Sequence, residues 1–283
     1  MEFWQIVVLA IIQGAAELLP VSSSAHVIFV AKLMDPNWKA TTPESIFLLI
    51  MLHTGTMFAA IMYFWSSWKT ILFAPKQPRT GGWHFIGMIV IATGVTGFIA
   101  LGLQKLLKAF AHVEVEELFD NLPLIAAALG AAGILILIAS RYDRVEHGGT
   151  LSWGAALVIG LVQGFCLPFR GFSRSGATIS MGLLRGVQRR LAENFSFALA
   201  VVLTPPLIVR QVVKLSQSAE LKGADLSELM LPGLVGMVLS FLAGLLALRL
   251  LSAVLELGRW AFFGIYCLAF AAVIFVVAMR NGW

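Results

Sequence analysis

The stretch QGFCLPFRGFSRSGATIS, residues 163–180, interrupts an apolar segment that runs from Leu151 to Leu184. The segment is long enough to cross a membrane, yet its middle holds Arg170, Arg174, a proline, hydroxyls and several glycines. A charged side chain at membrane depth costs about 2.5–3.5 kcal/mol on insertion scales. Two arginines in a broken helix therefore indicate a functional site. A plain loop between two short helices is the alternative.

A second stretch near the N-terminus, QGAAELLPVSSSAH at residues 13–26, follows the same plan. Both stretches begin with Gln-Gly, pass through a proline and reach a cluster of serines that opens a second helical piece. Weak internal symmetry of this kind is typical of secondary transporters and related membrane enzymes. We therefore expect two related halves.

The composition is that of an integral membrane protein and excludes a soluble domain. The chain has 283 residues, of which 59% are hydrophobic and 12% charged, and its mean hydropathy is +0.89. The net charge of +5 lies mostly in short loops, so we expect no nucleic-acid partner. Met1 and Glu2 provide no basic start, which argues against a cleavable signal peptide. Cys166 and Cys267 stand alone in apolar segments, which favours buried thiols over a disulfide.

Each broken segment predicts a re-entrant helical hairpin. The first extends from Phe3 to Met34, and its halves of about 14 residues would each be ~21 Å long, whereas the hydrocarbon core is about 30 Å thick. Leu151–Leu184 forms the second hairpin. Irregular backbone at membrane depth is tolerated only inside the protein or along a cavity. We therefore expect both turns to be buried near the membrane midplane.

Further apolar segments predict full crossings at Ile46–Trp65, Phe85–Leu103, Leu122–Ser140, Phe195–Val213, Leu231–Leu251 and Trp260–Met279. Each half then holds one hairpin and three transmembrane helices. Because three is odd, the second half must be inverted relative to the first. The predicted fold is a single all-α membrane domain over residues 1–283, with inverted-topology repeats at about 1–140 and 151–283.

Loop charge predicts the orientation. One side collects ten basic residues: Lys69, Lys76, Arg79, Arg141, Arg144, Arg185, Arg189, Arg190, Arg249 and Arg259. The other collects seven, together with most of the acidic residues: Lys32, Lys39, Lys105, Lys108, Lys214, Lys222 and Arg280. We expect the side with ten in the cytoplasm. The first hairpin then enters from the extracytoplasmic face and the second from the cytoplasmic face.

The two returning helices predict an anion-binding site where they begin. Helix N-termini carry about half a positive charge and several free N–H groups. In the inverted repeat the N-termini of the two returning helices face each other, and Arg174 lies between them. Its planar guanidinium suits phosphate oxygens. The second hairpin adds the hydroxyl donors Ser173, Ser175 and Thr178. For Ser22 and Ser24, ordinary N-caps of buried helices are an equal alternative.

The first hairpin predicts a base and a nucleophile. Gln13 and Glu17 are four residues apart and share one helix face. His26 follows one turn into the returning helix, and Ser23 precedes it. A carboxylate that orients a histidine, with a hydroxyl or imidazole that attacks phosphorus, is a familiar arrangement in phosphoryl transfer. The alternative for His26 is a core histidine bonded to a carbonyl group.

A carboxylate beside a diphosphate also favours a divalent cation, because Mg²⁺ typically takes one or two carboxylates together with phosphate oxygens. Glu17 is the candidate ligand. His53 lies within a predicted crossing, where lining the pocket and forming a helix–helix hydrogen bond are equal alternatives.

With these residues the chain resembles the undecaprenyl-pyrophosphate phosphatase family, the integral-membrane type associated with bacitracin resistance, over essentially its whole length. One family motif, Glu/Gln-x-x-x-Glu leading into Pro-Val-Ser-Ser-x-x-His, is met by Gln13, Glu17 and PVSSSAH at residues 20–26. The other, Pro-Gly-x-Ser-Arg-Ser-Gly-Ala-Thr, is met by RGFSRSGAT at residues 170–178. The stretch ENFSFALA at residues 193–200 is similar to the one that follows the second family motif.

The resemblance implies hydrolysis of a C55 isoprenyl diphosphate to the monophosphate carrier lipid, used in cell-wall synthesis, and inorganic phosphate. It implies Mg²⁺ or Ca²⁺ dependence, and a bacterial inner membrane location with the site open to the extracytoplasmic side. Glu17 and His26 would be catalytic, and either Ser23 or His26 would be the nucleophile. The substrate-binding residues would be Arg174 as the diphosphate clamp, with Ser173, Ser175, Thr178, Gln13, Ser22 and Arg170.

Two positions depart from the family pattern. Gln13 replaces the more frequent first glutamate, so metal binding would rest on Glu17 alone. Arg170 stands where the family usually has proline and adds a second cation beside Arg174. This change either tightens anion binding or marks a branch with a different substrate.

Two other classes of membrane protein share parts of this pattern. Lipid phosphatases of the acid-phosphatase type are excluded, because the chain has no Lys-x6-Arg-Pro element and carries Ser180, not histidine, six positions after Arg174. The main alternative is a transporter or flippase for lipid phosphate or another anion, because broken helices in inverted repeats are typical of transporters. Glu17 favours the enzyme, since binding an anion needs no carboxylate. The oligomeric state stays open, with a homodimer as one alternative.

Overall fold

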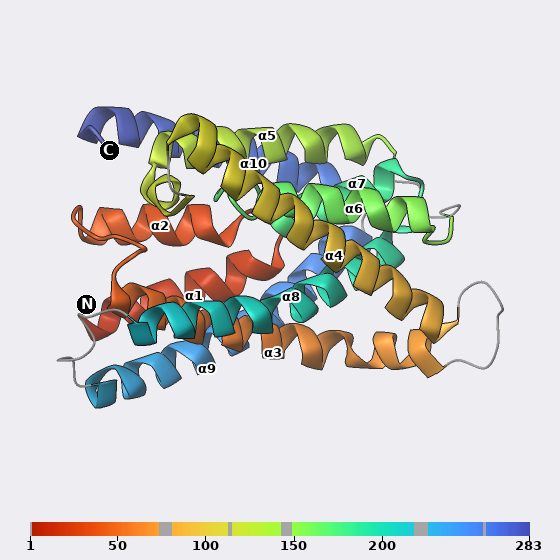
Figure 1. Cartoon of the computed structure of the whole chain (residues 1–283), viewed down its shortest axis with the longest axis horizontal. Helices are drawn as coiled ribbons and strands as arrows, with labels where there is room; N and C mark the ends of the chain where they lie inside the picture. The colour runs from red at the N-terminus through yellow and green to blue at the C-terminus, as the bar shows by residue number, and fades with distance from the viewer. Residues whose placement is uncertain (1, 74–80, 113–114, 143–148, 218–225, 257–258) are drawn as a thin grey trace.

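The computed structural model describes residues 2–73, 81–112, 115–142, 149–217, 226–256 and 259–283. In chain order its elements are α1 (Phe3–Leu18), α2 (Ser23–Met34), α3 (Pro43–Phe73), α4 (Gly82–Leu106), the π-helical η1 (Leu107–Ala111), the 3-10 helix η2 (Val115–Asp120), α5 (Leu122–Ser140), α6 (Trp153–Cys166), α7 (Arg174–Leu184), α8 (Arg189–Gln217), α9 (Leu226–Glu256) and α10 (Trp260–Asn281). The predicted all-α fold is confirmed (Figure 1). Of the residues in the loop-charge comparison, Lys76, Arg79, Arg144 and Lys222 lie outside the described residues.

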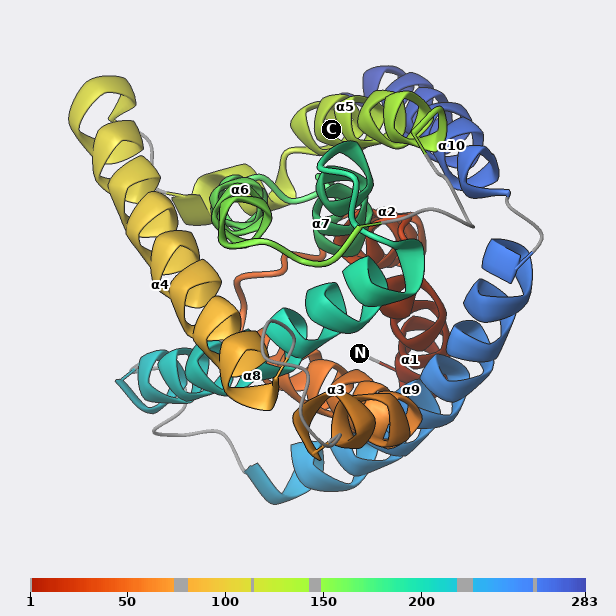
Figure 2. The same cartoon turned by 90° about the vertical axis from the view of Figure 1, so that its right-hand side faces the viewer.

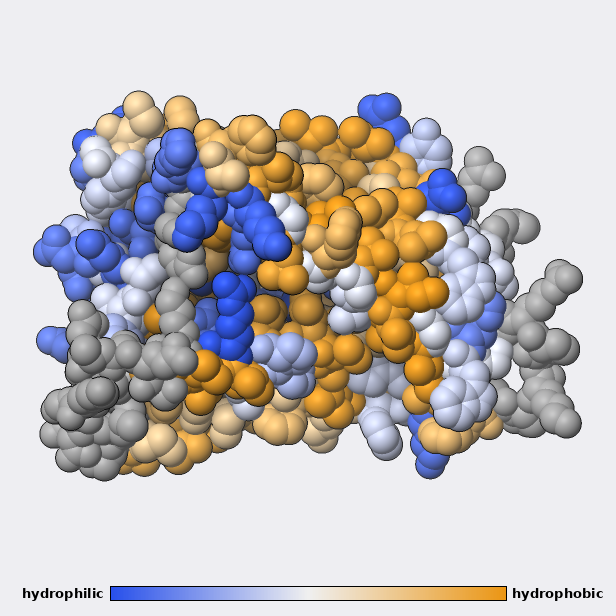
Figure 3. All heavy atoms as spheres, in the orientation of Figure 1, coloured by the Kyte–Doolittle hydropathy of each residue, from blue (hydrophilic) through white to orange (hydrophobic). Residues whose placement is uncertain are grey.

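Long apolar helices confirm a multi-span membrane protein. Within the described residues, six helices are long and apolar enough to span a membrane, namely α3, α4, α5, α8, α9 and α10. They contain the six predicted crossings. Figure 3 shows a largely apolar side surface with hydrophilic side chains gathered toward both ends of the long axis. Phe98 and Leu246, 78% and 69% exposed, are among the side chains that would face lipid.

The first hairpin breaks over residues 19–22, as predicted from its proline and serines. Leu19 is extended, with φ −91° and ψ 153°, which is the conformation that a following proline favours. Ser22 takes the positive φ of 67°. Its Oγ accepts a hydrogen bond from the Ala25 N–H at 3.4 Å, so Ser22 is the N-cap of α2.

The second hairpin breaks over residues 167–173. Gly171 has φ 100°, and a Cβ there would lie 2.3 Å from the carbonyl oxygen of Ile125 in α5. Only glycine fits this close, left-handed position. Ser173 then caps α7, since its Oγ accepts from the Gly176 N–H at 3.2 Å.

The two hairpin turns meet in the middle of the molecule. Figure 1 shows α1 and α2 toward the end that holds both chain termini, and α6 and α7 toward the opposite end. The Gly171 N–H donates to Ser24 Oγ at 3.2 Å, and Ser175 Oγ donates to the Leu19 carbonyl at 3.1 Å. Backbone and hydroxyl groups of both turns thus satisfy each other away from water.

Each hairpin packs against a crossing from the other half of the sequence. α1 lies along α9, α6 lies along α4, and α5 and α10 lie side by side (Figure 2). The glycines of the two Gln-Gly pairs permit this approach. A Cβ at Gly14 would be 2.5 Å from the Ser240 carbonyl oxygen, and one at Gly164 would be 3.0 Å from the Thr96 carbonyl oxygen. These matched pairings agree with two related halves, while the inversion itself stays a prediction.

Candidate active site

A cavity of about 400 Å³ lies where the two hairpin turns meet, and α3, α4 and α8 complete its walls. Polar residues of both turns line it: Gln13, Glu17, Ser22, Ser23 and Ser24 from the first, and Arg170, Ser173, Arg174 and Ser175 from the second. The surrounding helices supply mainly apolar side chains, including Leu49, Leu203 and Leu207. The cavity therefore combines a polar floor with apolar walls.

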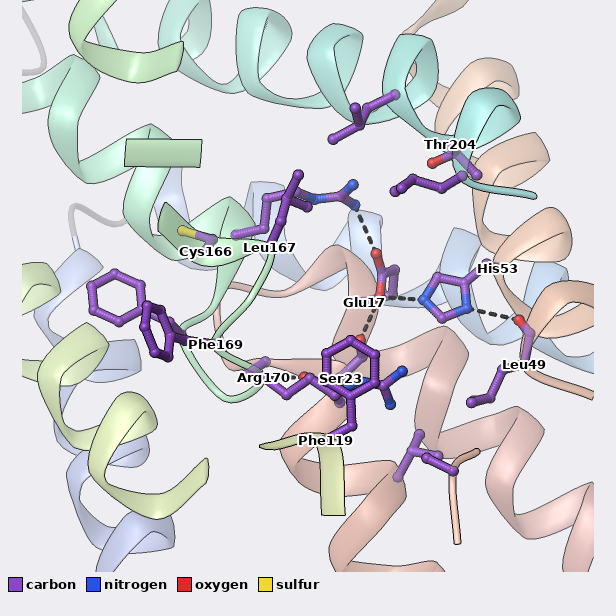
Figure 4. A pocket seen from close by; sticks show the side chains of 18 of the residues that line it. Glu17, Ser23, Leu49, His53, Phe119, Cys166, Leu167, Phe169, Arg170 and Thr204 are labelled. Atoms are coloured by element: carbon purple, nitrogen blue, oxygen red, sulfur yellow. Dashed lines mark hydrogen bonds and ion pairs between the residues drawn. The ribbon is translucent and has the colours of Figure 1, made fainter. Parts of the chain in front are cut away.

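Glu17 is the centre of the polar contacts (Figure 4). Its Oε1 accepts a hydrogen bond from Arg174 Nη2 at 2.7 Å. Its Oε2 accepts from the Ser23 hydroxyl and from Gln13 Nε2, the latter at 3.1 Å. The Glu17 side chain is only 12% exposed. A carboxylate, a hydroxyl and a guanidinium from the two hairpins are thus in direct contact.

His53 of α3 joins this cluster, with its Nε2 3.8 Å from Glu17 Oε2 (Figure 4). Its Nδ1 lies 2.7 Å from the Leu49 carbonyl oxygen, and because a carbonyl only accepts, Nδ1 carries the proton. In the neutral ring Nε2 then presents a lone pair to the carboxylate. Two neighbouring acceptors suit a shared proton or cation. Of the two alternatives for His53, the structure shows the pocket-lining one.

Arg170 also lines the cavity, and its guanidinium stacks over the ring of Phe119 with 4.1 Å between Cζ and the ring centroid. Figure 4 shows the two side chains against each other. A cation over an aromatic face is attracted by the ring quadrupole, which fixes its position. Asp120 follows Phe119 and accepts a hydrogen bond from the Ala40 N–H at 3.0 Å. The Asp120 carboxylate also acts on the charge of Arg170, so this end of the cavity wall holds a guanidinium with an acidic group nearby.

Two of the predicted site residues do not lie among the lining residues of the cavity. His26 Nδ1 is 2.8 Å from the Ser22 carbonyl oxygen and Nε2 is 2.7 Å from Tyr266 Oη, so both ring nitrogens are engaged outside the cavity. Thr178 is fully buried, and its hydroxyl contacts the Arg174 carbonyl at 2.8 Å and Ser196 Oγ at 2.5 Å. Every other candidate residue lines the cavity, whereas His26 and Thr178 do not.

The lining residues that the sequence did not select include one charged and two amide side chains. Arg210 and Gln211 of α8 and Gln104 of α4 form part of the wall. Figure 3 shows hydrophilic side chains interrupting the apolar surface between α4 and α8. Arg210 lies in an apolar crossing, so the intramembrane-charge argument that selected Arg170 and Arg174 would have selected it too.

The charges of the lining residues favour an anionic ligand. Glu17 is the acidic residue among them, and it is paired with Arg174. Arg170 and Arg210 add two further guanidinium groups. The first residues of α2 and α7, Ser23 and Arg174, also line the cavity, so the positive ends of both helix dipoles lie at its wall. This arrangement suits an anionic ligand such as a phosphate group, and the Ser23 hydroxyl beside it already donates to Glu17.

The described residues contain no group of three or more His, Cys, Asp or Glu side chains that could enclose a metal ion. Glu17 offers the carboxylate oxygens that Mg²⁺ and Ca²⁺ prefer, and a bound phosphate ligand would supply further oxygens.

Comparison with known proteins shows the family to which the chain belongs. The chain matches the family described as bacitracin resistance protein BacA over residues 6–273. A relative from Acinetobacter baylyi, named undecaprenyl-diphosphatase 2, is 53% identical over 98% of this chain and 99% of its own length. Relatives from Burkholderia ambifaria, named undecaprenyl-diphosphatase 2, and Desulfosudis oleivorans, named undecaprenyl-diphosphatase, are 32% and 33% identical over 100% and 99% of this chain, and over 97% and 100% of their own lengths. The chain therefore belongs to the family of the bacitracin resistance protein BacA.

Proposed function

We propose that this protein hydrolyses undecaprenyl diphosphate to undecaprenyl phosphate and inorganic phosphate, and so returns the carrier lipid to cell-wall synthesis. The names of its relatives support this substrate. The observation that carries the proposal is the contact of Ser23 and Arg174 with the two oxygens of Glu17. A site that only bound an anion would gain nothing from a carboxylate in contact with the anion-binding guanidinium.

Ser23 is the proposed nucleophile. Its Oγ attacks the terminal phosphorus while its proton passes to Glu17 Oε2. The bond from phosphorus to the bridging oxygen breaks, and the lipid monophosphate leaves with the electron pair. Water then attacks the phosphoserine, Glu17 returns the proton to Ser23 Oγ, and dihydrogen phosphate is released. Of the sequence alternatives, Ser23 is favoured over His26 because only Ser23 lines the cavity.

Arg174 is the proposed clamp for the diphosphate. Its side chain is 22% exposed and lines the cavity, so the guanidinium can stay on Glu17 and also bind phosphate oxygens. The N-terminal N–H groups of α2 and α7 would stabilise the charge that develops on the phosphoryl group. Gln13 holds the carboxylate from its other side at 3.1 Å and thus orients the base. Ser22 and Ser173 support the two N-termini as caps.

A divalent cation, Mg²⁺ or Ca²⁺, is part of this proposal. Glu17, whose Oε2 lies 3.8 Å from His53 Nε2, would hold the cation, and the diphosphate would supply further oxygens. The cation would neutralise charge on the diphosphate. Because the protein offers one carboxylate here, the cation and the substrate would bind together.

The proposed location is the bacterial inner membrane, with the cavity open to the extracytoplasmic side. The described Lys and Arg residues of the more basic side lie near the end of the molecule opposite both termini (Figure 1). The positive-inside rule places that end in the cytoplasm. The cavity wall includes Ala40, Gln104 and Phe119, which belong to segments at the other end. Apolar residues of α4 and α8, such as Leu101 and Leu203, would accept the start of the polyprenyl chain.

The test is phosphate release from undecaprenyl diphosphate by purified protein, compared with a Ser23→Ala variant. We expect turnover by the wild type and a loss of about a thousandfold or more in the variant. Ser140→Ala is the matched control, because Ser140 Oγ donates to the Leu137 carbonyl in α5, away from the cavity. No release by the wild type, combined with transport of labelled phosphate or lipid phosphate across proteoliposome membranes, would contradict the enzyme and support a transporter.

A further inference from the structure

The residue before Ser23 has an unusual backbone. Ser22 has φ 67° and ψ 95°, and among the described residues only Ser22 and His112 are non-glycine residues with positive φ. Such a conformation persists only where the surroundings impose it. Since α2 begins at Ser23, the backbone of Ser22 sets where the Ser23 side chain points.

His26, one turn further along α2, contacts the Ser22 carbonyl oxygen with both its ring and its backbone. Its Nδ1 lies 2.8 Å from the Ser22 carbonyl oxygen, to which the His26 backbone N–H also donates, at 3.4 Å. The carbonyl cannot donate, so Nδ1 carries the proton. In the neutral ring Nε2 is then the acceptor, and the Tyr266 hydroxyl 2.7 Å away is its donor. The hydrogen bonds run in one direction, from Tyr266 through His26 to the Ser22 carbonyl.

Helix α10 holds the imidazole ring in place. The ring stacks on Phe270 with centroids 4.1 Å apart and planes 15° apart. Cys267, next to Tyr266 in α10, places its Sγ 3.5 Å from the Pro20 carbonyl oxygen in the same turn. His26 is buried and does not line the cavity. It therefore has no ring nitrogen left for substrate and acts on the turn alone.

We propose that His26 and Tyr266 are positioning residues that hold Ser22 in its positive-φ conformation and thereby keep Ser23 Oγ on Glu17. The inference rests on the proposed phosphatase function and assigns to Tyr266, 240 positions from His26, a part in that reaction. It also replaces the direct catalytic role that the family resemblance implies for His26. Both residues would affect the chemical step and leave substrate binding largely unchanged.

Replacing His26 by asparagine and by glutamine distinguishes a positioning role from a direct catalytic role. In His26→Asn, the amide nitrogen is as many bonds from Cα as Nδ1 and can still donate to the Ser22 carbonyl. In His26→Gln, the nitrogen corresponds to Nε2 and that hydrogen bond is lost. A positioning role predicts that His26→Asn keeps at least about tenfold more activity than His26→Gln. A nucleophile or acid–base role predicts that both lose about a hundredfold or more alike.

If the His26 variants do not fold, the Tyr266→Phe variant alone tests the proposal. Removing one hydrogen-bond donor should lower kcat about two- to tenfold and change KM less than about twofold. Tyr63→Phe is the matched control, because Tyr63 Oη lies 2.5 Å from Ser252 Oγ between α3 and α9 and does not line the cavity. Its kcat should equal that of the wild type, and both variants should show the same Tm in detergent.

The measurements are kcat and KM for phosphate release from undecaprenyl diphosphate by the full-length proteins. Wild-type kcat in Tyr266→Phe, or equal losses in His26→Asn and His26→Gln, would overturn the inference while the proposed function stands. Absence of phosphate release by the wild type itself would contradict the proposed function, and this inference with it.

Discussion

Arg174 of α7 and Glu17 of α1 are 157 positions apart in the chain, and their side chains form an ion pair at 2.7 Å in the middle of the molecule. Neither hairpin contains both charges, so each supplies what neutralises the other at membrane depth. The pair also readies the site, because the guanidinium that would bind diphosphate is already fixed by the carboxylate that would accept the Ser23 proton.

Replacing Arg174 should separate binding geometry from charge. Arg174→Ala should abolish phosphate release, a loss of at least about a hundredfold. Arg174→Lys should recover only a small fraction, because an ammonium cannot form the two parallel hydrogen bonds of a guanidinium. Turnover of undecaprenyl diphosphate by the purified variants checks both. Arg185→Ala, an exposed position that caps the other end of α7, should behave like the wild type. Near-wild-type activity in Arg174→Lys would rule out the clamp.

Phosphate release should need both Glu17 and a divalent cation. Chelator should silence the wild type, and addition of Mg²⁺ or Ca²⁺ should restore it, because the diphosphate and Glu17 share the cation. Glu17→Gln should either remove activity or raise the cation concentration needed for half-maximal activity. Phosphate release in a metal titration of both proteins measures this. If chelator leaves the wild type unchanged, Glu17 serves only in proton transfer.

Gln13→Glu should be tolerated and should strengthen cation binding. Gln13 Nε2 lies 3.1 Å from Glu17, so the change places a second carboxylate beside the first. Two carboxylates repel each other without a cation and attract one more strongly together. The Mg²⁺ concentration for half-maximal activity should fall about threefold or more. The exposed Gln188→Glu change, between α7 and α8, is the control and should leave this concentration unchanged. An equal shift in both variants would contradict a cation site at Glu17.

Much of the fold could be predicted because hydrophobic length and breaks are local properties of the sequence. The six crossings follow from long apolar runs, and Pro20 and Gly171 mark the two turns. The meeting of Glu17, Ser23 and Arg174 followed from placing both turns at the same depth.

The positions of the remaining site residues depended on contacts between segments that are distant in the sequence. Thr178 is only four positions after Arg174, yet its hydroxyl contacts Ser196 of α8 and does not line the cavity. His26 lies one turn from Ser23, but the α10 side chain Tyr266 takes its Nε2. His53 could equally have bonded to a neighbouring helix, and only the position of α3 beside the first hairpin brings it to the cavity. No local pattern states which face of a helix a distant helix will cover.

Arg170 should help to hold the inorganic phosphate that the reaction leaves in the cavity. Hydrolysis leaves inorganic phosphate in a cavity whose wall carries Arg170, Arg174 and Arg210 against the one acidic residue, Glu17, among its described lining residues. Because the charge of Arg174 is partly balanced by Glu17, Arg170 and Arg210 should add to the hold on the phosphate, which should then inhibit turnover. Arg170→Pro, which restores the commoner family residue, and Arg170→Gln should each raise the phosphate concentration for half inhibition by about tenfold.

A phosphate titration of turnover measures this effect, with Arg141→Gln as the control because Arg141 is exposed at the end of α5, away from the cavity. Its inhibition should match that of the wild type. Arg170→Gln separates loss of the guanidinium from any backbone effect of proline, so both Arg170 variants should shift together. If neither shifts, Arg170 takes no part in binding phosphate, and its stacking on Phe119 would serve only to hold the second hairpin against η2.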